Sequence, residues 1–552
     1  METVSKASLV EKIYQSQYCT HQCISGPFGK RLITYADHIA SGQSLIFIEE
    51  YLQDVVLPTY ANTHTEASFT GRQTSHYREE ARQFIKQSVN AGPDDVVLFC
   101  GSGSTSAIDK VVRRLQVDRF HRQNKPVVFL GPYEHHSNLL PWREGNFDVV
   151  QIPVDKEGLI DLHVLEEKLQ HYQYTARPLI GSFWAASNVT GILAPVDSIT
   201  ALLHQYGALS FWDYAAAAPY TKINMNPGTI LNKDGVFISA HKFVGGPSTP
   251  GILVVKKHLF NTRVPTMPSG GTVHFVTKTQ QRYFEDIETR EEGGTPAIID
   301  SIRAGLVFKL KDTVGADYIE KRERNYITRA IHQFKQHPNV YILGNTDVAR
   351  LGFLAFHIRC ADRFLHHNFV VALLNDLFGI QARGGCSCAG PYGHDLLALS
   401  ETKSQAYMDE LATGNVGSKP GWVRLNFNYF IPEAEFLFIV DAILWLATHG
   451  WKLLNFYEFD DQTALWHPLG YKAPVSSLSN FLTHKQAAAS KTAIDRVNEY
   501  ESYLQQANAL AGQALMEWPD VTTQTYRYSQ VTNPLRWYAL ADDMVVEDTI
   551  AV

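Results

Sequence analysis

The chain has 552 residues, of which 45% are hydrophobic, so it can bury a large core and is too apolar for a disordered protein. Its formal net charge of −7 lacks the basic excess that sequence-independent binding to a phosphate backbone needs, so we expect no nucleic-acid partner. Six cysteines are too few for a disulfide scaffold in a chain of this length.

The N-terminal region predicts neither a secretion signal nor a metal site. It has no apolar core followed by a small-residue cleavage site. Cys19 and Cys23 have no second pair at zinc-ligand spacing, so we expect no bound metal. The longest apolar stretch, 436–451, contains Asp441 and His449 and is shorter than the roughly 20 residues of a membrane span. We therefore expect a soluble, cytoplasmic protein with no membrane partner.

From about residue 93 to 255, short β-rich runs alternate with helical or loop segments. Near-continuous apolar strands at this spacing are typical of a mainly parallel sheet that is covered on both faces. Ligands bind such sheets at the carboxyl ends of the strands, so the residues that follow each run are candidate ligand contacts. The predicted strands are 95–99, 126–130, 147–154, 178–184, 208–213, 235–240 and 251–255.

A second pattern, between 341 and 450, predicts a smaller α+β unit. The segments VYILGN, LGFLAFHI and WVRLNFNYF are expected strands, and FVVALLNDLF and EAEFLFIVDAILWLA are expected helices. A third region begins near 451 and contains one convincing helix, about 485–517. Ile494, Val497, Leu504 and Leu515 lie near helical spacing there, and Pro519 follows its end.

The region after 451 carries more large aromatic side chains than a solvated tail would. We therefore expect it to pack on the body of the protein, over the mouth of the site or at a subunit contact. These residues are Trp451, Phe456, Tyr457, Trp466, Trp518 and Trp537.

The first chemical motif is the turn CGSGSTS, which follows the strand 95–99 and opens a helix. Free backbone N–H groups at a helix start, together with hydroxyl groups, can hold an anion. A dinucleotide loop, a phosphate cup and a simple helix cap all fit this pattern. Ser106 stands where the third glycine of a dinucleotide loop would be, which disfavours that interpretation.

The second motif is a lysine beyond a strand end, in ISAHKFVGGPSTPG. Lysines normally lie on solvated faces; the alternative is that an apolar setting lowers the pKa of Lys242 until its amine forms a Schiff base. Asp213 ends another strand, 29 residues upstream, in SFWDYAAAAPY. If it is buried, this carboxylate needs a cationic or hydrogen-bonding partner, and a protonated pyridine nitrogen would serve. Two more strand-end segments, 134–142 and 187–191, supply a histidine ring and an amide.

Taken together, these motifs resemble the class V branch of the fold-type-I pyridoxal phosphate enzymes, most closely the cysteine desulfurases. Six segments carry the resemblance in the family's order, within about 35–442. They are YADHIASG (35–42), EHHSNLLPW (134–142), SNVTG (187–191), SAHK (239–242), EEGGTPAI (291–298) and RGGCSCAGP (383–391).

The resemblance implies a fold and a domain division. The large domain is expected to be a three-layer α/β/α PLP-transferase of fold type I, with a mainly parallel sheet, beside a smaller α+β domain and a C-terminal extension. We predict an N-terminal segment (1–45) that packs on the small domain, then a large cofactor-binding domain (46–310). A small domain (311–450) and a helical or irregular extension (451–552) would follow.

The resemblance also assigns catalytic roles. Lys242 would hold pyridoxal phosphate as a Schiff base and later move the α-proton. His135 would stack on the pyridine ring, and Asp213 would pair with the ring nitrogen. Arg424 matches the arginine that grips the substrate α-carboxylate, and Cys388 matches the nucleophilic cysteine.

Other matching residues would bind the cofactor. Asn188 would donate a hydrogen bond to the phenolate oxygen. Thr295 would reach the phosphate from the neighbouring subunit, because sites of this fold lie at a dimer interface. The residues that would hold the phosphate within the chain are Ser104, Thr105, Ser239 and His241.

Simpler interpretations stay open for several of these positions. His135 and His136 can be ordinary capping or core groups, and Arg424 can be a surface arginine on an edge strand. Arg383 is either structural or in contact with substrate. Cys386 is expected to be a neighbour without a catalytic role, and Cys388 can simply pack behind the site.

The sequence departs from the desulfurase pattern at two places. Ala216 stands where desulfurases usually have a glutamine or histidine that bonds the cofactor phenolate, so one donor is missing. Gly384, Cys386 and Ser387 replace the family's threonine and paired histidines in the cysteine loop. These differences bear on substrate and reaction rather than on the cofactor.

We therefore expect a homodimeric enzyme with shared active sites that acts on an amino acid. Its best-matching chemistry is C–S cleavage of cysteine, which gives alanine, a persulfide on Cys388 and a possible sulfur-acceptor partner. The alternative is a class V aminotransferase or a lyase on another amino acid, with Cys388 not a nucleophile. A non-catalytic scaffold is a further alternative that the intact set of Lys242, Asp213, His135 and Asn188 disfavours. A dinucleotide oxidoreductase is disfavoured because the glycine loop is incomplete.

Overall fold

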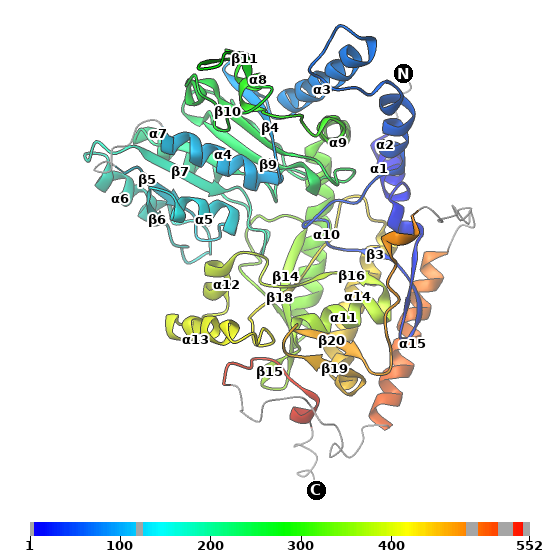
Figure 1. Ribbon diagram of the computed structural model, residues 1–552. Helices are drawn as coiled ribbons and strands as arrows, with labels where there is room; N and C mark the ends of the chain where they lie inside the picture. The colour runs from blue at the N-terminus through cyan, green and yellow to red at the C-terminus, as the bar shows by residue number, and fades with distance from the viewer. Residues whose placement is uncertain (1–4, 118–124, 482–494, 517–533, 545–552) are drawn as a thin grey trace.

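A seven-stranded sheet forms the large domain of the computed structural model, which describes residues 5–117, 125–481, 495–516 and 534–544 (Figure 1). The strand order is β4-β10-β9-β8-β7-β5-β6; β10 is antiparallel to both its neighbours, and the other pairs are parallel. The strands are β4 (Asp95–Cys100), β5 (Val127–Leu130), β6 (Asp148–Gln151), β7 (Leu179–Trp184), β8 (Leu209–Asp213), β9 (Gly235–Ser239) and β10 (Gly251–Lys256). All seven predicted strands, and the mainly parallel sheet, are confirmed.

Both faces of this sheet are covered. Val127 and Phe129 of β5 belong to one hydrophobic core, whereas Val128 and Leu130 belong to another, because side chains alternate between the faces of a strand. Helices α4 (Gly103–Val117) and α5 (His136–Glu144) contribute to the second core, and α6 (Leu162–Tyr172), α7 (Val196–Gln205) and α9 (Ile298–Val314) to the first. The result is the expected three-layer α/β/α architecture.

A second, antiparallel sheet forms the small domain. Its order is β13-β14-β18-β17, with β15 paired to β14. The strands are β13 (Val340–Ile342), β14 (Phe353–Cys360), β15 (Arg363–Phe364), β17 (Arg383–Gly385) and β18 (Trp422–Asn426). Its helices are α10 (Ala316–Gln336), α11 (His367–Phe378), α12 (Gly390–Leu396), α13 (Glu401–Ala412) and α14 (Glu433–His449). The predicted α+β unit is confirmed, although the boundaries of all four predicted domains stay predictions.

Helix α14 and the turn after it form an apolar stretch that is longer than we expected. The stretch Glu433–Phe456 has 24 residues, so its length and composition alone would allow it to cross a membrane. However, 61% of its most apolar window is buried inside the protein. Buried residues such as Phe436, Ile439 and Ile443 pack in the main core, so α14 acts as a core helix here.

The part of the chain before β4 contains elements that the sequence analysis did not predict. These are α1 (Lys6–Gln15), the hairpin β1 (Cys23–Gly26) and β2 (Gly29–Leu32), the short strand β3 (Thr34–Tyr35), α2 (Ile46–Tyr51) and α3 (Phe69–Ser88). Strand β3 pairs in parallel with β16 (Ile380–Gln381) of the small domain. Among the described residues, no group of His, Cys, Asp or Glu side chains is arranged to hold a metal ion.

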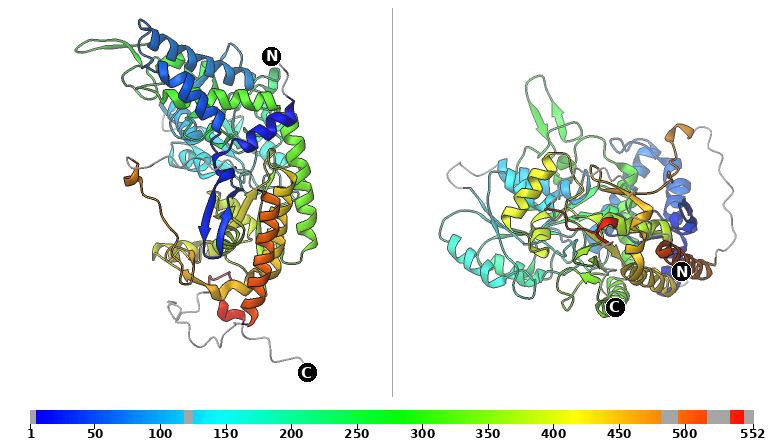
Figure 2. Two further views of the ribbon diagram at one scale, coloured as in Figure 1. Left: turned by 90° about the vertical axis from the view of Figure 1, so that its right-hand side faces the viewer. Right: turned by 90° about the horizontal axis from the view of Figure 1, so that it is seen from below.

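The C-terminal region packs on the body, as expected from its aromatic residues. It contains the unpredicted hairpin β19 (Tyr457–Asp460) and β20 (Leu465–Pro468), and helix α15 (Arg496–Met516). Tyr457 and Trp466 are buried, while Trp518 and part of the predicted helix 485–517 lie outside the described residues. Helix α15 lies beside the hairpin β1–β2, as the left view of Figure 2 shows.

One further hairpin, β11 (Val273–Val276) and β12 (Gln281–Tyr283), projects away from the large domain (Figure 2). It is followed by the short helix α8 (Ile287–Glu291). Its apolar side chains Phe275 and Val276 are 66% and 56% exposed. They therefore have little cover from their own chain.

Candidate functional site

One cavity of about 720 Å³ lies at the carboxyl ends of β4, β8 and β9, facing the small domain. It brings together every predicted site residue except Thr295. These lining residues are Ser104, Thr105, His135, Asn188, Asp213, Ser239, His241, Lys242, Cys388 and Arg424. Arg383, whose role the sequence left open, also lines it.

The turn between β4 and α4 forms the floor of the cavity. Gly103 begins α4 at φ +54°, and a Cβ there would lie 2.9 Å from Ser239 Oγ and 3.0 Å from His241 Cε1. A glycine is therefore needed for both backbone conformation and space. The backbone N–H of Ser104 donates to Ser239 Oγ at 2.8 Å, which joins this turn to the end of β9. The free N–H groups at the start of α4 point to an anion site beside these hydroxyls.

Lys242 and Asp213 are the two ionisable groups at adjoining strand ends. Burial lowers the pKa of Lys242 to about 8, although the Asp213 carboxylate opposes that shift. Burial also raises the pKa of Asp213 to about 6. The backbone N–H of Ala215 donates to Asp213 Oδ1 at 2.9 Å, whereas the buried Oδ2 has no hydrogen-bond partner. An unpaired buried carboxylate oxygen is costly, so it marks a place for a donor that the protein itself lacks.

His135 caps helix α5 and presents a neutral ring to the cavity. Its Nδ1 accepts a hydrogen bond from the backbone N–H of Ser137 at 3.1 Å, so Nδ1 carries no proton. Burial and the nearby Lys242 lower its pKa to about 3. The ring packs edge-on against Trp184, with centroids 5.6 Å apart. The ring is therefore both a cap and an aromatic surface inside the cavity, and the two interpretations of this residue are compatible.

Arg424 lies on β18 and is almost fully buried, not a surface arginine. It donates from Nη2 to Asp37 Oδ1 and from Nη1 to the backbone carbonyl of Asn188, both at 3.0 Å. Its buried Nε has no partner. The guanidinium is thus held at two points and keeps an unused N–H, which suits recognition of a carboxylate.

The cysteine loop is held from several sides. The backbone N–H of His136 donates to the Cys388 carbonyl at 2.9 Å, and His136 Nε2 accepts from the N–H of Gly390 at 3.0 Å. Asn188 Nδ2 donates to the Ser387 carbonyl at 2.7 Å. Ser387 and Cys388 have φ of +53° and +55°, an uncommon conformation for residues with side chains. The loop is therefore a constrained turn, as its glycine and proline content predicted.

Asn188 makes a contact within the protein that the sequence did not predict. One of its N–H groups is taken by the Ser387 carbonyl, and its buried Oδ1 has no partner. Its predicted bond to a cofactor phenolate stays a prediction that only the second N–H can satisfy. Ala216 is fully buried and offers no donor there. Cys386 packs against the main core, which agrees with the expectation that it has no catalytic role.

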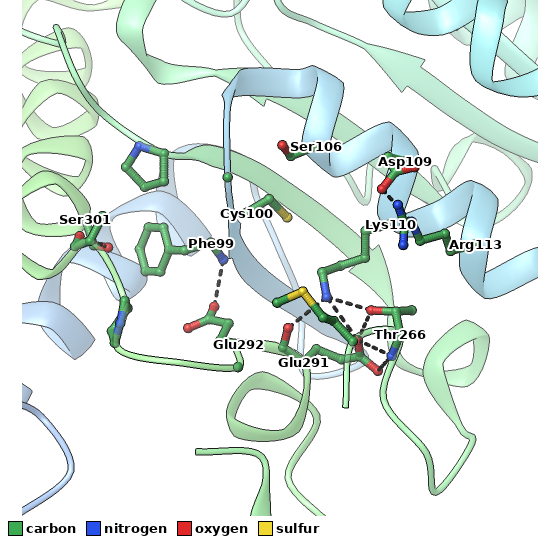
Figure 3. A pocket seen from close by; sticks show the side chains of 16 residues that line it. Phe99, Cys100, Ser106, Asp109, Lys110, Arg113, Thr266, Glu291, Glu292 and Ser301 are labelled. Atoms are coloured by element: carbon green, nitrogen blue, oxygen red, sulfur yellow. Dashed lines mark hydrogen bonds and ion pairs between the residues drawn. The ribbon is translucent and has the colours of Figure 1, made fainter. Parts of the chain in front are cut away.

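A second cavity, of about 430 Å³, adjoins the first and is lined by fully paired charges (Figure 3). Lys110 Nζ contacts Glu291 Oε2 at 3.0 Å and Thr266 Oγ1 at 2.8 Å. Glu292 accepts from Arg82 and from the backbone N–H of Phe99. These contacts anchor the two glutamates that immediately precede the predicted Gly-Gly-Thr-Pro segment.

Thr295 does not line either cavity and is exposed in its own chain. This placement agrees with a contact to another subunit, which stays a prediction. Sequence reasoning missed two residues that hold parts of the cavity wall in place. Asp37 stands in the quoted motif YADHIASG but was given no role, and His136 was left as an ordinary polar group. Only the fold places them against Arg424 and Cys388.

A family model described as aminotransferase class-V matches residues 34–405, which is more than half of the chain. The chain belongs to this family. It is a pyridoxal phosphate-dependent enzyme of fold type I, and the resemblance drawn from the six motifs is confirmed. The segments before residue 34 and after residue 405 lie outside that match.

Two similar curated proteins are both named as cysteine desulfurases, one of them as probable. A probable cysteine desulfurase of Halalkalibacterium halodurans is 27% identical over 380 residues, 68% of this chain and 89% of the relative. A cysteine desulfurase of Dickeya dadantii is 26% identical over 387 residues, 69% of this chain and 89% of the relative.

Solved structures share the fold. A cysteine desulfurase from Thermococcus onnurineus superposes with a TM-score of 0.63 at 23% identity, and covers 75% of this chain and 95% of its own. The cysteine desulfurase CsdA from Escherichia coli gives a TM-score of 0.58 at 22% identity, over 74% and 93% of the two chains.

Proposed function

We propose that this enzyme is a cysteine desulfurase-like protein that takes sulfur from cysteine onto Cys388 and releases alanine. The observation that carries the proposal is the composition of a single cavity. It combines a buried lysine, an unpaired carboxylate oxygen on Asp213, an arginine with a spare N–H and a thiol on a constrained turn. The names of the curated relatives support the same reaction.

The cavity suits pyridoxal phosphate. Asp213 Oδ2 is buried without a partner, and a protonated pyridine nitrogen is the donor that it lacks. The start of α4, with Ser104, Thr105, Ser239 and His241 around it, offers N–H and hydroxyl donors to a phosphate. The neutral His135 ring offers a face for stacking. When bound, the cofactor supplies an electron sink that weakens bonds at the α-carbon of an amino acid.

The protein's own groups then have distinct tasks. Arg424, fixed by Asp37 and the Asn188 carbonyl, orients the substrate through its α-carboxylate. Lys242, whose pKa near 8 leaves part of the amine neutral at physiological pH, removes and returns the proton at Cα. Burial lowers the pKa of Lys242 and the Asp213 carboxylate raises it, and the balance leaves an amine that can act as a base.

Cys388 acts on the sulfur atom of the substrate. Its thiolate forms an S–S bond with that sulfur while the Cβ–S bond breaks, and Cβ gains a proton. One cysteine and the Cys388 thiol thereby become alanine and a Cys388 persulfide, with no external oxidant or reductant. The bonds from His136 and Asn188 to the turn hold the thiol at the cavity during this attack.

The assembly and location that we propose rest on smaller observations. The exposed apolar pair Phe275 and Val276 on a projecting hairpin, with Thr295 exposed nearby in sequence, favours a homodimer with shared sites. Light scattering tests the dimer. A persulfide on Cys388 would need a sulfur-acceptor partner, and a cytoplasmic location stays a prediction.

The decisive experiment incubates the wild-type enzyme and Cys388→Ser with cysteine. We expect alanine release and a protein-bound persulfide of one added sulfur mass for the wild type, and neither for the variant. If the variant releases alanine at the wild-type rate, or the wild type forms no persulfide, the desulfurase proposal is wrong.

A second function, a class V aminotransferase or a lyase on another amino acid, is favoured by one specific observation. The buried Ala216 replaces the donor that desulfurases usually place beside the cofactor phenolate. Keto-acid formation from a panel of amino acids, with no dependence on Cys388, would identify this alternative.

A further inference from the structure

Two parts of the chain outside the family match, the residues before 34 and helix α15, contact each other. Arg31 Nη2 donates to Gln506 Oε1 at 3.0 Å, and the Arg31 guanidinium lies 4.7 Å from the centroid of the Tyr503 ring. The backbone N–H of Leu32 donates to the Tyr503 hydroxyl at 3.0 Å. Figure 2 shows α15 running alongside the strands β1 and β2. The helix thus holds the chain just before it enters strand β3.

A buried glutamate of the small domain secures this contact. Glu435 Oε2 accepts hydrogen bonds from the hydroxyls of Tyr14 at 2.6 Å and Tyr500 at 3.0 Å, and lies 3.4 Å from Arg496 Nη2. The Tyr500 ring stacks on Phe438 with centroids 3.9 Å apart. The N-terminal segment, α14 and α15 therefore meet at one carboxylate, and three donors to Oε2 offset part of the cost of its burial.

Arg496 extends this network onto β3 itself. Its Nη2 donates to the backbone carbonyl of Ile33 at 3.0 Å and lies 3.3 Å from Thr34 Oγ1. Its Nη1 donates to the carbonyl of Thr20 at 2.5 Å. One planar guanidinium therefore ties three points of the N-terminal segment, a fork that a lysine cannot reproduce.

Strand β3 leads directly into the substrate side of the cavity. It pairs in parallel with β16, so both strands end toward the same edge. Two residues after β3, Asp37 pairs with Arg424, and Ile39, Ala40 and Ser41 line the cavity. Two residues after β16, Arg383 lines the same cavity. The contacts from Arg496 to β3 therefore constrain the segment that carries Asp37, which orients Arg424.

We propose that helix α15 is a positioning element for the substrate-carboxylate subsite, and that it acts through Arg496 and β3 on the Asp37–Arg424 pair. This inference rests on the proposed function, because Arg424 is taken to hold the α-carboxylate. It gives the C-terminal extension a role in binding an amino acid. Neither Arg496 nor Asp37 is a catalytic residue in this account; both position Arg424.

The test compares Arg496→Met and the milder Tyr500→Phe with a control on the same helix. Asn508→Ala removes the bond from Trp445 Nε1 to Asn508 Oδ1, 2.7 Å long, and leaves β3 untouched. We expect KM for cysteine to rise roughly tenfold in Arg496→Met and roughly threefold in Tyr500→Phe, while kcat stays within about twofold. Arg496→Lys should restore only part of the affinity, and Asn508→Ala should leave KM unchanged.

A double-mutant cycle separates positioning from a general loss of stability. Asp37→Asn alone should raise KM by roughly tenfold. If both residues act through Arg424, Arg496→Met with Asp37→Asn should raise it little further than either single change. Additive effects of the two substitutions would overturn the inference, as would equal KM changes in Arg496→Met and Asn508→Ala.

Hydrogen exchange gives a readout that does not depend on turnover. The amides of residues 34–41 should exchange at least tenfold faster in Arg496→Met than in the wild type, and at the wild-type rate in Asn508→Ala. If these amides exchange at the wild-type rate in Arg496→Met, the inference that α15 constrains β3 is wrong. If the wild type forms no persulfide, the desulfurase function fails separately. The affinity for cysteine, measured through the change in cofactor absorption, still tests the inference in that case.

Discussion

The two adjoining cavities differ in how their polar groups are satisfied. The larger one contains four buried side-chain polar atoms without partners: Trp184 Nε1, Asn188 Oδ1, Asp213 Oδ2 and Arg424 Nε. Among the described residues that line the smaller one, no buried side-chain polar atom lacks a partner; Lys110, Glu291 and Thr266 bond one another. Folding alone would favour satisfying every such group. The unpaired atoms thus indicate that the larger cavity binds a ligand. The paired atoms of the smaller cavity indicate that its side chains stabilise the fold.

Lys242→Ala, which tests whether the larger cavity attaches the cofactor, should have the largest effect. We expect the lysine-dependent visible absorption and all turnover to disappear, because no other described lysine lines the larger cavity. Absorption spectra before and after borohydride reduction measure this. A reducible band that persists in the variant would show that Lys242 is not the attachment point.

Asp213→Asn should separate stability from function. Activity should fall by at least ~100-fold, about 3 kcal/mol, because the ring nitrogen loses its counter-charge. Without cofactor, however, the variant should be more stable than the wild type at pH 7.5, on the order of 1–3 kcal/mol, because an unpaired buried carboxylate is removed.

The pH dependence of that stability difference has a definite sign. Burial raises the pKa of Asp213 from its ordinary value of 3.8 to about 6 in the folded protein, so folding disfavours its ionised form. The advantage of Asp213→Asn should therefore be full above pH 6 and shrink as the pH falls toward 4. Urea unfolding of the cofactor-free proteins measures it. An advantage that grows on acidification would contradict the assigned burial.

His136→Ala should act on the cysteine turn and leave the cofactor in place. Losing the ring nitrogen removes the acceptor for the Gly390 N–H, so persulfide formation should slow roughly tenfold, on the scale of one buried hydrogen bond. The absorption spectrum should not change. His136→Gln, which keeps an acceptor, should recover part of the rate. Equal rates in Ala and Gln variants would assign no role to this bond.

Lys110→Met, in the smaller cavity, should have the smallest effect on activity. Breaking the ion pair leaves Glu291 buried with fewer partners, so the free energy of unfolding should fall by roughly 2–4 kcal/mol. Turnover per folded enzyme should stay within about threefold of the wild type. A variant of normal stability that loses turnover would reverse the assignment of the two cavities.

Much of the fold and site could be predicted because the signals are local. The seven strands of the large sheet are apolar runs with turns between them, and periodicity alone indicates them. The residues at their ends converge because parallel strands share an edge, which places Asp213 beside Ser239 and Lys242. The hairpins β1–β2 and β19–β20 could not be predicted because each strand has only four residues, too few for a reliable periodic signal, and gains stability from helices that pack against it.

The sequence by itself identified the family and singled out Lys242, Asp213 and the cysteine loop as candidate site residues, because each depends on a residue type within a short motif. Only the tertiary structure decided which groups touch. It joined Asp37 to Arg424 across 387 positions, and Arg496 to Glu435 across 61. It also showed that one Asn188 N–H goes to the cysteine loop. Such pairings depend on burial, which makes distant polar groups seek one another and which no local pattern records.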